Sequence, residues 1–346
     1  MTEAAIDEVL DRFARTGPEF GPGLSNHGPM GAEALVTMGR SDVIVGWSEW
    51  YSARLQEHPP ARKPIAADEW REALGDMTRV GDWVAFFGRE LDGRPWRDVL
   101  DTWVARLGPG VMAGATHGIL RTAHAVRTLA SSGEDARRTH ELAEGLGYWA
   151  ARYQELPGEL AAPGGLEIRA ALARAPRSAD AIQHRGLIFE TVKGIDAASF
   201  APVINSVAVS DVDEFVSSIT RTFVRQYLAN AGHAAIAFIH TVTAPSSLRI
   251  LAPQLSRPTT EAAMRYAWQA CASIFAAYAT GAFADPSADA AVAFDAADLI
   301  DQAVTARDEH AIKFTDACLR EHLITGDPAF IVAARDVVVR LNRSRG

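Results

Sequence analysis

The segment from Asp298 to Ile324 reads DLIDQAVTARDEHAIKFTDACLREHLI, and its apolar residues recur at helical spacing. Leu299, Ala303, Phe314 and Ala317 fall on one stripe, which predicts a helix with one buried face. Similar periodicity extends along most of the chain, whereas alternating β-branched runs are scarce. The sequence therefore predicts an all-α fold, a large helical domain with loops rich in glycine and proline.

Further helices are expected before this segment. An opening helix carries its apolar face on Ile6, Val9, Leu10 and Phe13. Other expected helices cover residues 30–39, 111–129, 212–229, 231–242 and 260–283. Pro245 predicts a helix end just after residue 243, because proline cannot continue a helix without losing a hydrogen bond.

The remaining segments define the expected domain organisation. Residues 189–209 are the best place for any strand. The Gly/Pro-rich segments 156–158 and 163–165 bound the only candidate linker. We expect one domain over residues 1–346, with a subdivision near 156–165 as the single alternative.

Composition excludes several classes of protein. The chain has 346 residues, of which 48% are hydrophobic and 22% charged, as in a globular protein with a sizeable core. Its net charge of -9 has no basic run, which argues against nucleic-acid binding. Cys271 and Cys318 are too few for a disulfide framework or a zinc ribbon. No P-loop, HExxH, ExxH or GxSxG motif is present.

Two segments bear on targeting. The N-terminal stretch is acidic and amphipathic, without the apolar core of a signal peptide. The most apolar long stretch, residues 262–283, includes Arg265 and Gln269, so a buried helix explains it better than a membrane span. We expect a cytoplasmic protein with no membrane partner.

The placement of ten histidines is the most informative feature of the sequence. Four have polar, charged or proline neighbours, which predicts surface positions: His58, His140, His184 and His322. Six lie in apolar or glycine-rich surroundings: His27, His117, His124, His233, His240 and His310. Any one of these six is best interpreted as a buried histidine in a polar network. Six together favour a metal site, because histidine is the commonest metal ligand.

Spacing limits which histidines can share one ion. His117 and His124 are seven residues apart, as are His233 and His240. Two helical turns separate the members of a pair by about 10.5 Å along the axis. Since metal–nitrogen bonds are about 2.0–2.1 Å, each pair supplies one ligand without strain. Spacing alone does not say which member that is.

His310 and Lys313 are three residues apart on the quoted segment, so they share a helix face. His310 falls on the apolar stripe and Lys313 lies beside it. One interpretation is a surface ion pair between Lys313 and Glu309, four residues earlier. The other is a buried lysine whose lowered pKa frees the amine. A free amine can react with carbon dioxide to give a carbamate, which is an anionic oxygen ligand.

Four segments that contain these residues resemble motifs of the questin oxidase family. They are residues 24–30, LSNHGPM; 116–120, THGIL; 238–243, FIHTVT; and 308–313, DEHAIK. The corresponding family motifs are N-H-x-P, H-P-x-I, M-H-x-V-T and H-x-x-K. They occur in the family's order, and the resemblance extends over about residues 20 to 320, most of the chain.

The resemblance implies a mononuclear non-haem iron held by four histidines and a carboxylated lysine. Its implied ligands in this chain are His27, His117, His240, His310 and carboxylated Lys313. This set takes one member of each pair spaced by seven residues. The fungal members have a second histidine where this chain has Arg121, and Gly118 and Leu120 also depart from their pattern. These departures leave the implied metal ligands unchanged, but they argue against carrying over the substrate of the fungal members.

The implied activity is oxidative ring opening of an aromatic polyketide, such as an anthraquinone or hydroquinone. Fe(II) would be the cofactor and O2 the co-substrate, with NADPH as a candidate reductant. Five protein ligands leave one position of an octahedron, and either Baeyer–Villiger-like insertion or dioxygenative C–C cleavage would follow. His124 and His233 are candidates for proton transfer or for orienting ligands. Asp308 and Glu309 are weaker candidates, because a solvated helix turn also explains them.

A flat substrate needs an apolar pocket with aromatic walls. Candidate lining residues are Trp47, Trp50, Tyr51, Trp83, Phe86 and Phe87, most of which are also expected in the ordinary core.

Two other functions remain open at this point. A metal-dependent hydrolase could use a site of histidines and a carboxylated lysine to activate water. A non-enzymatic helical binding protein would place the six histidines in core polar networks. The expected partner is a small aromatic molecule, and a homodimer is compatible with the sequence.

Overall fold

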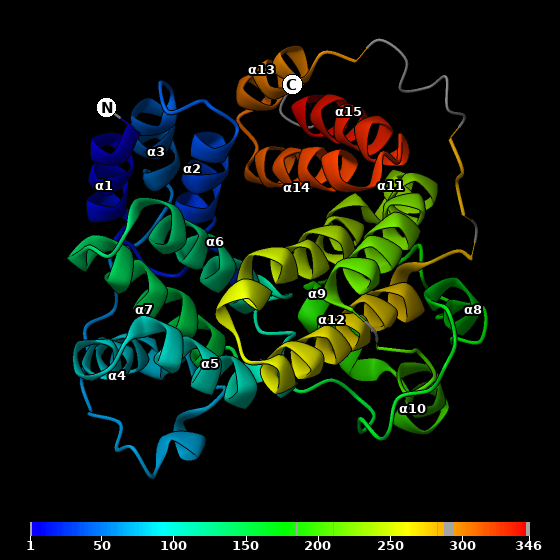
Figure 1. Cartoon of the computed structure of the whole chain (residues 1–346), viewed down its shortest axis with the longest axis horizontal. Helices are drawn as coiled ribbons and strands as arrows, with labels where there is room; N and C mark the ends of the chain where they lie inside the picture. The colour runs from blue at the N-terminus through cyan, green and yellow to red at the C-terminus, as the bar shows by residue number, and fades with distance from the viewer. Residues whose placement is uncertain (1, 185, 210, 282, 287–293, 344–346) are drawn as a thin grey trace. The chain divides into compact units, whose positions relative to one another are not determined.

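The computed structural model describes residues 2–184, 186–209, 211–281, 283–286 and 294–343. These residues form fifteen α-helices and one two-stranded sheet, so the predicted all-α fold is confirmed (Figure 1). In the sheet, β1 (Glu19–Phe20) pairs antiparallel with β2 (Leu24–Ser25). This short hairpin leads directly into the first histidine segment.

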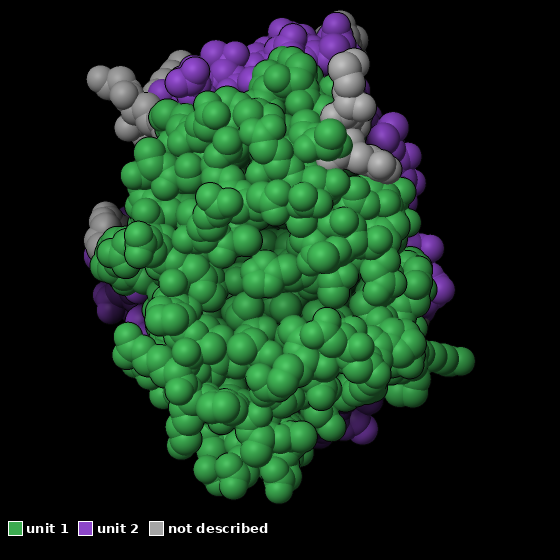
Figure 2. All heavy atoms as spheres, turned by 90° about the vertical axis from the view of Figure 1, so that its left-hand side faces the viewer, with its two compact units in different colours: residues 1–155, 250–259 green, residues 156–249, 260–346 purple. Residues whose placement is uncertain are grey.

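The chain divides into two compact units, coloured separately in Figure 2. Unit 1 comprises Met1–Glu155 and Ile250–Thr259, and unit 2 comprises Leu156–Arg249 and Thr260–Gly346. The boundary after Glu155 lies directly before the predicted subdivision near 156–165.

Unit 1 is built from seven α-helices and short 3-10 turns in its described residues. The helices are α1 (Thr2–Phe13), α2 (Gly28–Thr37), α3 (Ile44–Ser52), α4 (Val80–Gly93), α5 (Trp96–Leu107), α6 (His117–Ser132) and α7 (Ala136–Ala151). The 3-10 turns are η1 (Trp70–Ala73), η2 (Met77–Arg79), η3 (Gly108–Gly110) and η5 (Ala252–Gln254). The predicted apolar face of α1 is buried.

Aromatic side chains of α4 and α5 form a cluster in the core of unit 1. Trp83 stacks on Phe87 with ring centroids 5.7 Å apart, and Trp103 meets Phe87 edge-on at 4.9 Å. Phe86 lies 5.3 Å from Trp103. Burial of such rings stabilises the fold strongly. Three candidate pocket residues, Trp83, Phe86 and Phe87, are therefore part of this core.

Unit 2 contains the remaining helices, apart from the last two residues of α11 and the first three of α12, which belong to unit 1. They are α8 (Ile168–Leu172), α9 (Ile188–Thr191), α10 (Ala197–Ile204), α11 (Val212–Leu251), α12 (Arg257–Tyr278), α13 (Ala296–Ala306), α14 (Glu309–Thr325) and α15 (Ala329–Arg343), with the 3-10 turn η4 (Val192–Gly194). The described residues 189–209 hold the end of α9, η4, α10 and a single parallel bridge from Val207 to Leu166, so the strand expected there does not form. Asp196 starts α10 by accepting a hydrogen bond from the Ser199 amide at 2.9 Å.

Helix α11 joins two helices that the sequence predicted separately. It is kinked at Ala234, where φ is -137° and ψ 34°. It also continues through Pro245, so the predicted end after residue 243 is wrong. Proline removes the hydrogen bond to the carbonyl four residues earlier, which belongs to Thr241. The buried Cys271 thiol donates to that carbonyl at 3.5 Å, which compensates in part.

Among the described residues, Val212–Gln254 is long and apolar enough to cross a membrane, and 78% of its most apolar window is buried inside the protein. Of the stretch predicted as a buried apolar helix, residues 262–283, residues 262–278 form most of α12, whose central residues are buried. The helix ends five residues earlier than predicted, and residue 282 lies outside the described residues.

The quoted segment 298–324 is interrupted once. Arg307 has φ 52°, which ends α13. Asp308 then starts α14 by accepting hydrogen bonds from the amides of His310 and Ala311 at 2.9 and 3.3 Å. The predicted stripe is therefore shared by two helices, while His310 and Lys313 stay together on α14.

Candidate metal centre

Unit 1 brings His27 and His117 together from segments ninety residues apart. Their ring centroids lie 4.3 Å apart, and their ligand nitrogens lie within 4.8 Å of each other. His27 is the N-cap residue of α2, and His117 is the first residue of α6. Both imidazoles are buried. Two of the five implied ligands therefore form a pair at adjoining helix ends.

Hydrogen bonds from the surrounding loop hold His27 in place. The side-chain nitrogen of Asn26 donates to the Gly17 carbonyl at 2.9 Å, and its side-chain oxygen accepts from the Gly28 amide at 2.9 Å. The His27 amide donates to the buried Tyr51 hydroxyl at 2.9 Å. Tyr51, a candidate pocket residue, thus supports the backbone of His27.

A strained turn positions His117. Gly114, Ala115 and Thr116 have φ values of 55°, 58° and 71°, the left-handed region that side chains disfavour. The turn presents the Gly114 carbonyl to His117 Nδ1. When that carbonyl accepts the Nδ1 proton, the lone pair resides on Nε2, the usual arrangement for a metal-ligating histidine. The helix predicted from residue 111 therefore begins only at His117.

His124 contacts a carboxylate on the neighbouring helix. Its Nδ1 lies 2.5 Å from Oε2 of Glu33 on α2. Arg127 donates to the other oxygen of Glu33 at 2.6 Å. Burial raises the pKa of Glu33, but the charges of Arg127 and His124 outweigh it and hold the pKa well below its usual value. The contact links α2 to α6 two turns along from the His27–His117 pair.

Unit 2 brings together the other three implied ligands. His240 on α11 and His310 on α14 have ring centroids 6.1 Å apart and nearly perpendicular planes. The two helices also pack through Tyr227 and Phe314, whose rings lie 4.7 Å apart. Lys313, one turn after His310, is only 4% exposed. The interpretation of Lys313 as a surface residue is therefore wrong.

Burial sets the charge state of this cluster. It lowers the pKa of Lys313 to about 7, although Glu309 and Asp308 oppose the shift. It also lowers the pKa of His240 well below the usual value, and the nearby His310 and Lys313 act in the same direction. Neutral imidazole and neutral amine are the forms that metal ligation and carbamate formation require.

His233 contributes to the structure of unit 2 at the kink of α11. Its Nε2 lies 2.9 Å from the carbonyl of Tyr278, the last residue of α12. That contact satisfies a carbonyl at a helix C-terminus, where intrahelical partners are missing. Within unit 2, His233 therefore supports the junction of α11 and α12.

No sequence motif marks the groups that contact these histidines. Glu33, Gly114 and Tyr51 lie far from their histidines in sequence or act through the backbone. The predicted surface position of His58 is wrong, because the structure half-buries it beside Glu144.

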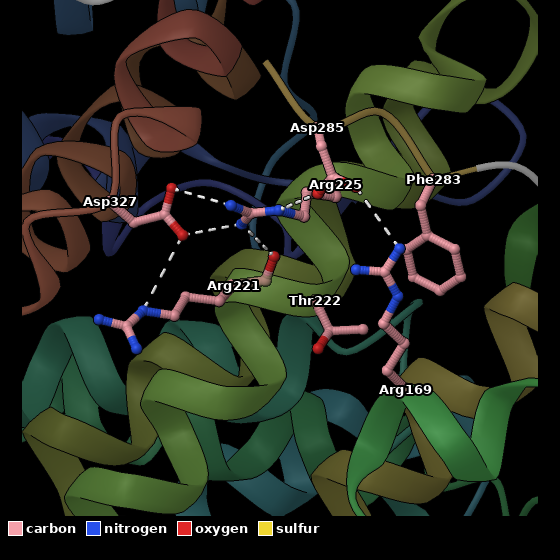
Figure 3. Close-up of a pocket in the computed structure, with 7 residues that line it drawn as sticks. All are labelled: Arg169, Arg221, Thr222, Arg225, Phe283, Asp285 and Asp327. Atoms are coloured by element: carbon pink, nitrogen blue, oxygen red, sulfur yellow. Dashed lines mark hydrogen bonds and ion pairs between the residues drawn. The ribbon is translucent and has the colours of Figure 1, made fainter. Parts of the chain in front are cut away.

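A separate recess in unit 2 has a cavity volume of about 290 Å³. It is lined by Arg169, Arg221, Thr222, Arg225, Phe283, Asp285 and Asp327. Figure 3 shows Arg225 between Asp285 and Asp327, with bonds of 2.7 Å to each. The two carboxylates thus offset two of the three arginine charges that line the recess.

The fold and these clusters define an all-α protein with buried histidines and a buried lysine suited to metal ligation. Residues 26–318 match the questin oxidase-like family, and the chain belongs to it. Membership implies an oxidoreductase of the oxygenase type. A search among curated proteins found no match.

Proposed function

We propose that the protein is a non-haem iron(II)-dependent oxygenase that opens an aromatic polyketide ring with O2. An anthraquinone or its hydroquinone is the proposed substrate class, cleaved by Baeyer–Villiger-like insertion or by dioxygenative C–C cleavage. Family membership supports the oxygenase class.

The observation that carries the proposal is the cluster in unit 2 of the buried His240 and Lys313 with the partly buried His310. A lysine enclosed beside two histidines is costly as an ammonium ion and has no lone pair to offer a metal. Addition of carbon dioxide to its neutral amine, with loss of a proton, gives a carbamate anion that can ligate. We propose that this carbamate, the two histidines and the His27–His117 pair bind one iron.

The residues fit that ion chemically. Imidazole nitrogen and anionic oxygen are suitable ligands for iron. Bound iron would supply one-electron chemistry with O2. Within unit 1, the Gly114 carbonyl orients His117, and the Tyr51 hydroxyl and Asn26 hold His27. These contacts would reduce the reorganisation needed to bind the ion.

Metal content and oxygen consumption test the proposal. Protein loaded anaerobically with Fe(II) should retain iron and take up O2 when an anthrahydroquinone is added, and assays with and without NADPH show whether a reductant is needed. His310→Ala should remain folded but lose iron and activity. His322→Ala, on the same helix, should keep both.

The other functions give different results. Ester hydrolysis with zinc and without oxygen uptake would support a hydrolase. A protein that binds no metal, and whose His310→Ala variant changes only in stability, would support a binding protein. Either result overturns the oxygenase proposal.

A further inference from the structure

The hydroxyl of Tyr148 joins the two short strands that precede His27. Tyr148 lies on α7 and is only 1% exposed. Its hydroxyl donates to Oε1 of Glu19 on β1 at 2.9 Å and lies 2.7 Å from the Ser25 hydroxyl on β2. Because a phenol has one proton, which Glu19 accepts, Ser25 is the donor in the second bond. One buried oxygen is thus bonded to both strands.

The hairpin keeps these two partners side by side. Glu19 and Ser25 lie opposite each other in the antiparallel pair. Arg152, the C-cap residue of α7, donates to both oxygens of Glu19, at 2.6 and 2.5 Å. His27 follows only two residues after Ser25, so an anchor at Ser25 limits where the His27 backbone can lie. Helix α7 therefore holds the segment that carries the first histidine.

The same hydroxyl also abuts the turn that precedes His117. Gly114, whose φ is 55°, packs so closely on Tyr148 that a Cβ there would overlap the hydroxyl oxygen and lie 2.9 Å from Cζ of the ring. The carbonyl of Gly114 faces Nδ1 of His117. Because the turn packs on the phenol, a change at the hydroxyl would shift the carbonyl that orients His117.

The residue next to Tyr148 fixes the same loop from a second direction. The Trp149 indole donates to the Gly110 carbonyl at 3.0 Å. A Cβ on Gly118, the residue after His117, would lie only 2.6 Å from Cγ of Trp149. Helix α6 therefore begins in direct contact with α7, and the loop has little room to compensate for a change at Tyr148.

The chemistry of the hydroxyl suits a permanent anchor. Burial and the charge of Glu19 raise the pKa of Tyr148 above its usual value, so the phenol keeps its proton and remains a donor. Its acceptor is a carboxylate, and hydrogen bonds to ionised acceptors are stronger than those between neutral groups.

We propose that Tyr148 is a positioning residue of the metal centre, whose hydroxyl fixes the imidazoles of His27 and His117 relative to each other. It acts through Ser25 on the first and through Gly114 on the second. The inference rests on the proposed function, which makes both imidazoles ligands of one ion. Their ring centroids lie 4.3 Å apart, and ligands that are already close together need less reorganisation to bind a metal.

Metal titration of the full chain tests this role. Tyr148→Phe removes the oxygen and keeps the ring. Its affinity for Fe(II), measured anaerobically, should fall about 10-fold, and the visible spectrum of bound Co²⁺ should change. The matched control is Tyr227→Phe in unit 2, which removes a buried tyrosine's bond of 2.7 Å to Asp336. It should lose stability but keep the affinity and spectrum of the wild type.

Ser25→Ala provides a milder second variant, because it removes one bond of the hydroxyl and leaves Tyr148 in place. Its metal affinity should lie between those of the wild type and Tyr148→Phe. Wild-type affinity and an unchanged Co²⁺ spectrum in both Tyr148→Phe and Ser25→Ala would overturn the positioning role, although the metal centre itself would stand.

A measurement on the metal-free protein separates this inference from the proposed function. NMR of protein labelled at the histidine ring nitrogens reports the environment of His117 Nδ1. That signal should move in Tyr148→Phe and stay in place in Tyr227→Phe. A wild type that binds no metal would overturn the proposed function. The NMR signal would then decide alone, and a signal unchanged in Tyr148→Phe would show that the hydroxyl does not orient His117.

Discussion

The two units hold their histidines by different physical means. In unit 1, directed polar contacts and a strained turn position His27 and His117. In unit 2, His240 and Lys313 are held by burial on packed helix faces. Directed contacts specify orientation, whereas burial specifies charge state, because it disfavours the ionised forms. The two units thus differ in the property that they fix, which is side-chain orientation in unit 1 and charge state in unit 2.

The largest expected effect is a loss of iron affinity when Lys313 is replaced, because burial sets the charge state of this lysine. Lys313→Ala removes the proposed carbamate donor, so iron affinity should fall by more than the ~10–100-fold loss that follows removal of a residue that only hydrogen-bonds to a metal ligand. Metal analysis and oxygen uptake measure this, and circular dichroism checks the fold. Propionate, a small carboxylate, should restore part of the activity.

The exposed Lys193, which pairs with Glu190 at 2.9 Å, provides the matched control. Lys193→Ala should keep full iron content. If Lys313→Ala also keeps it, unit 2 does not supply a carbamate ligand.

The next effect tests the polar contacts of unit 1. Glu33→Gln removes the charge that His124 and Arg127 face, and leaving the partly buried Arg127 guanidinium without its partner should cost about 2–4 kcal/mol of stability. Chemical denaturation measures the loss. Glu8→Gln, at an exposed ion pair with Arg12, should change stability by less than about 0.5 kcal/mol. Equal effects would show that the Glu33 contact does not hold α2 to α6.

A smaller effect is expected at the strained turn. Ala115→Gly relieves a left-handed residue and should stabilise the protein by up to about 1 kcal/mol. Ala113→Gly, two residues earlier and outside the positive-φ run, should destabilise it by about 0.5–1 kcal/mol. Thermal unfolding distinguishes the two. If both variants lose stability equally, the turn stores no strain.

The smallest effect concerns pH. Burial opposes protonation of His58, but contact with Glu144 outweighs it, so its folded-state pKa is raised above 6.5. The protonated form is therefore favoured by folding, and its stabilisation is fully present below pH 6.5 and lost as pH rises through the folded pKa. With a chelator present, unfolding free energy should decline over that window, and His58→Gln should abolish the decline. If the unfolding free energy of His58→Gln declines with pH as in the wild type, another group causes the decline.

Sequence periodicity predicted the helical class and the face of α1, because apolar spacing depends on local geometry. It missed the run of α11 through Pro245 and the break at Arg307. Tertiary contacts decide both: the Cys271 thiol satisfies a carbonyl that proline leaves open, and Asp308 starts a new helix. Spacing predicted one ligand from each histidine pair but could not choose between its members.

The sequence by itself determined the all-α class, the family and the candidate ligands, because these depend on residue identity and local order. Only the tertiary structure decided that Lys313 is enclosed, that His27 meets His117, and that His58 faces Glu144. Burial and contact between distant segments arise from packing of the whole chain, and no local pattern encodes them.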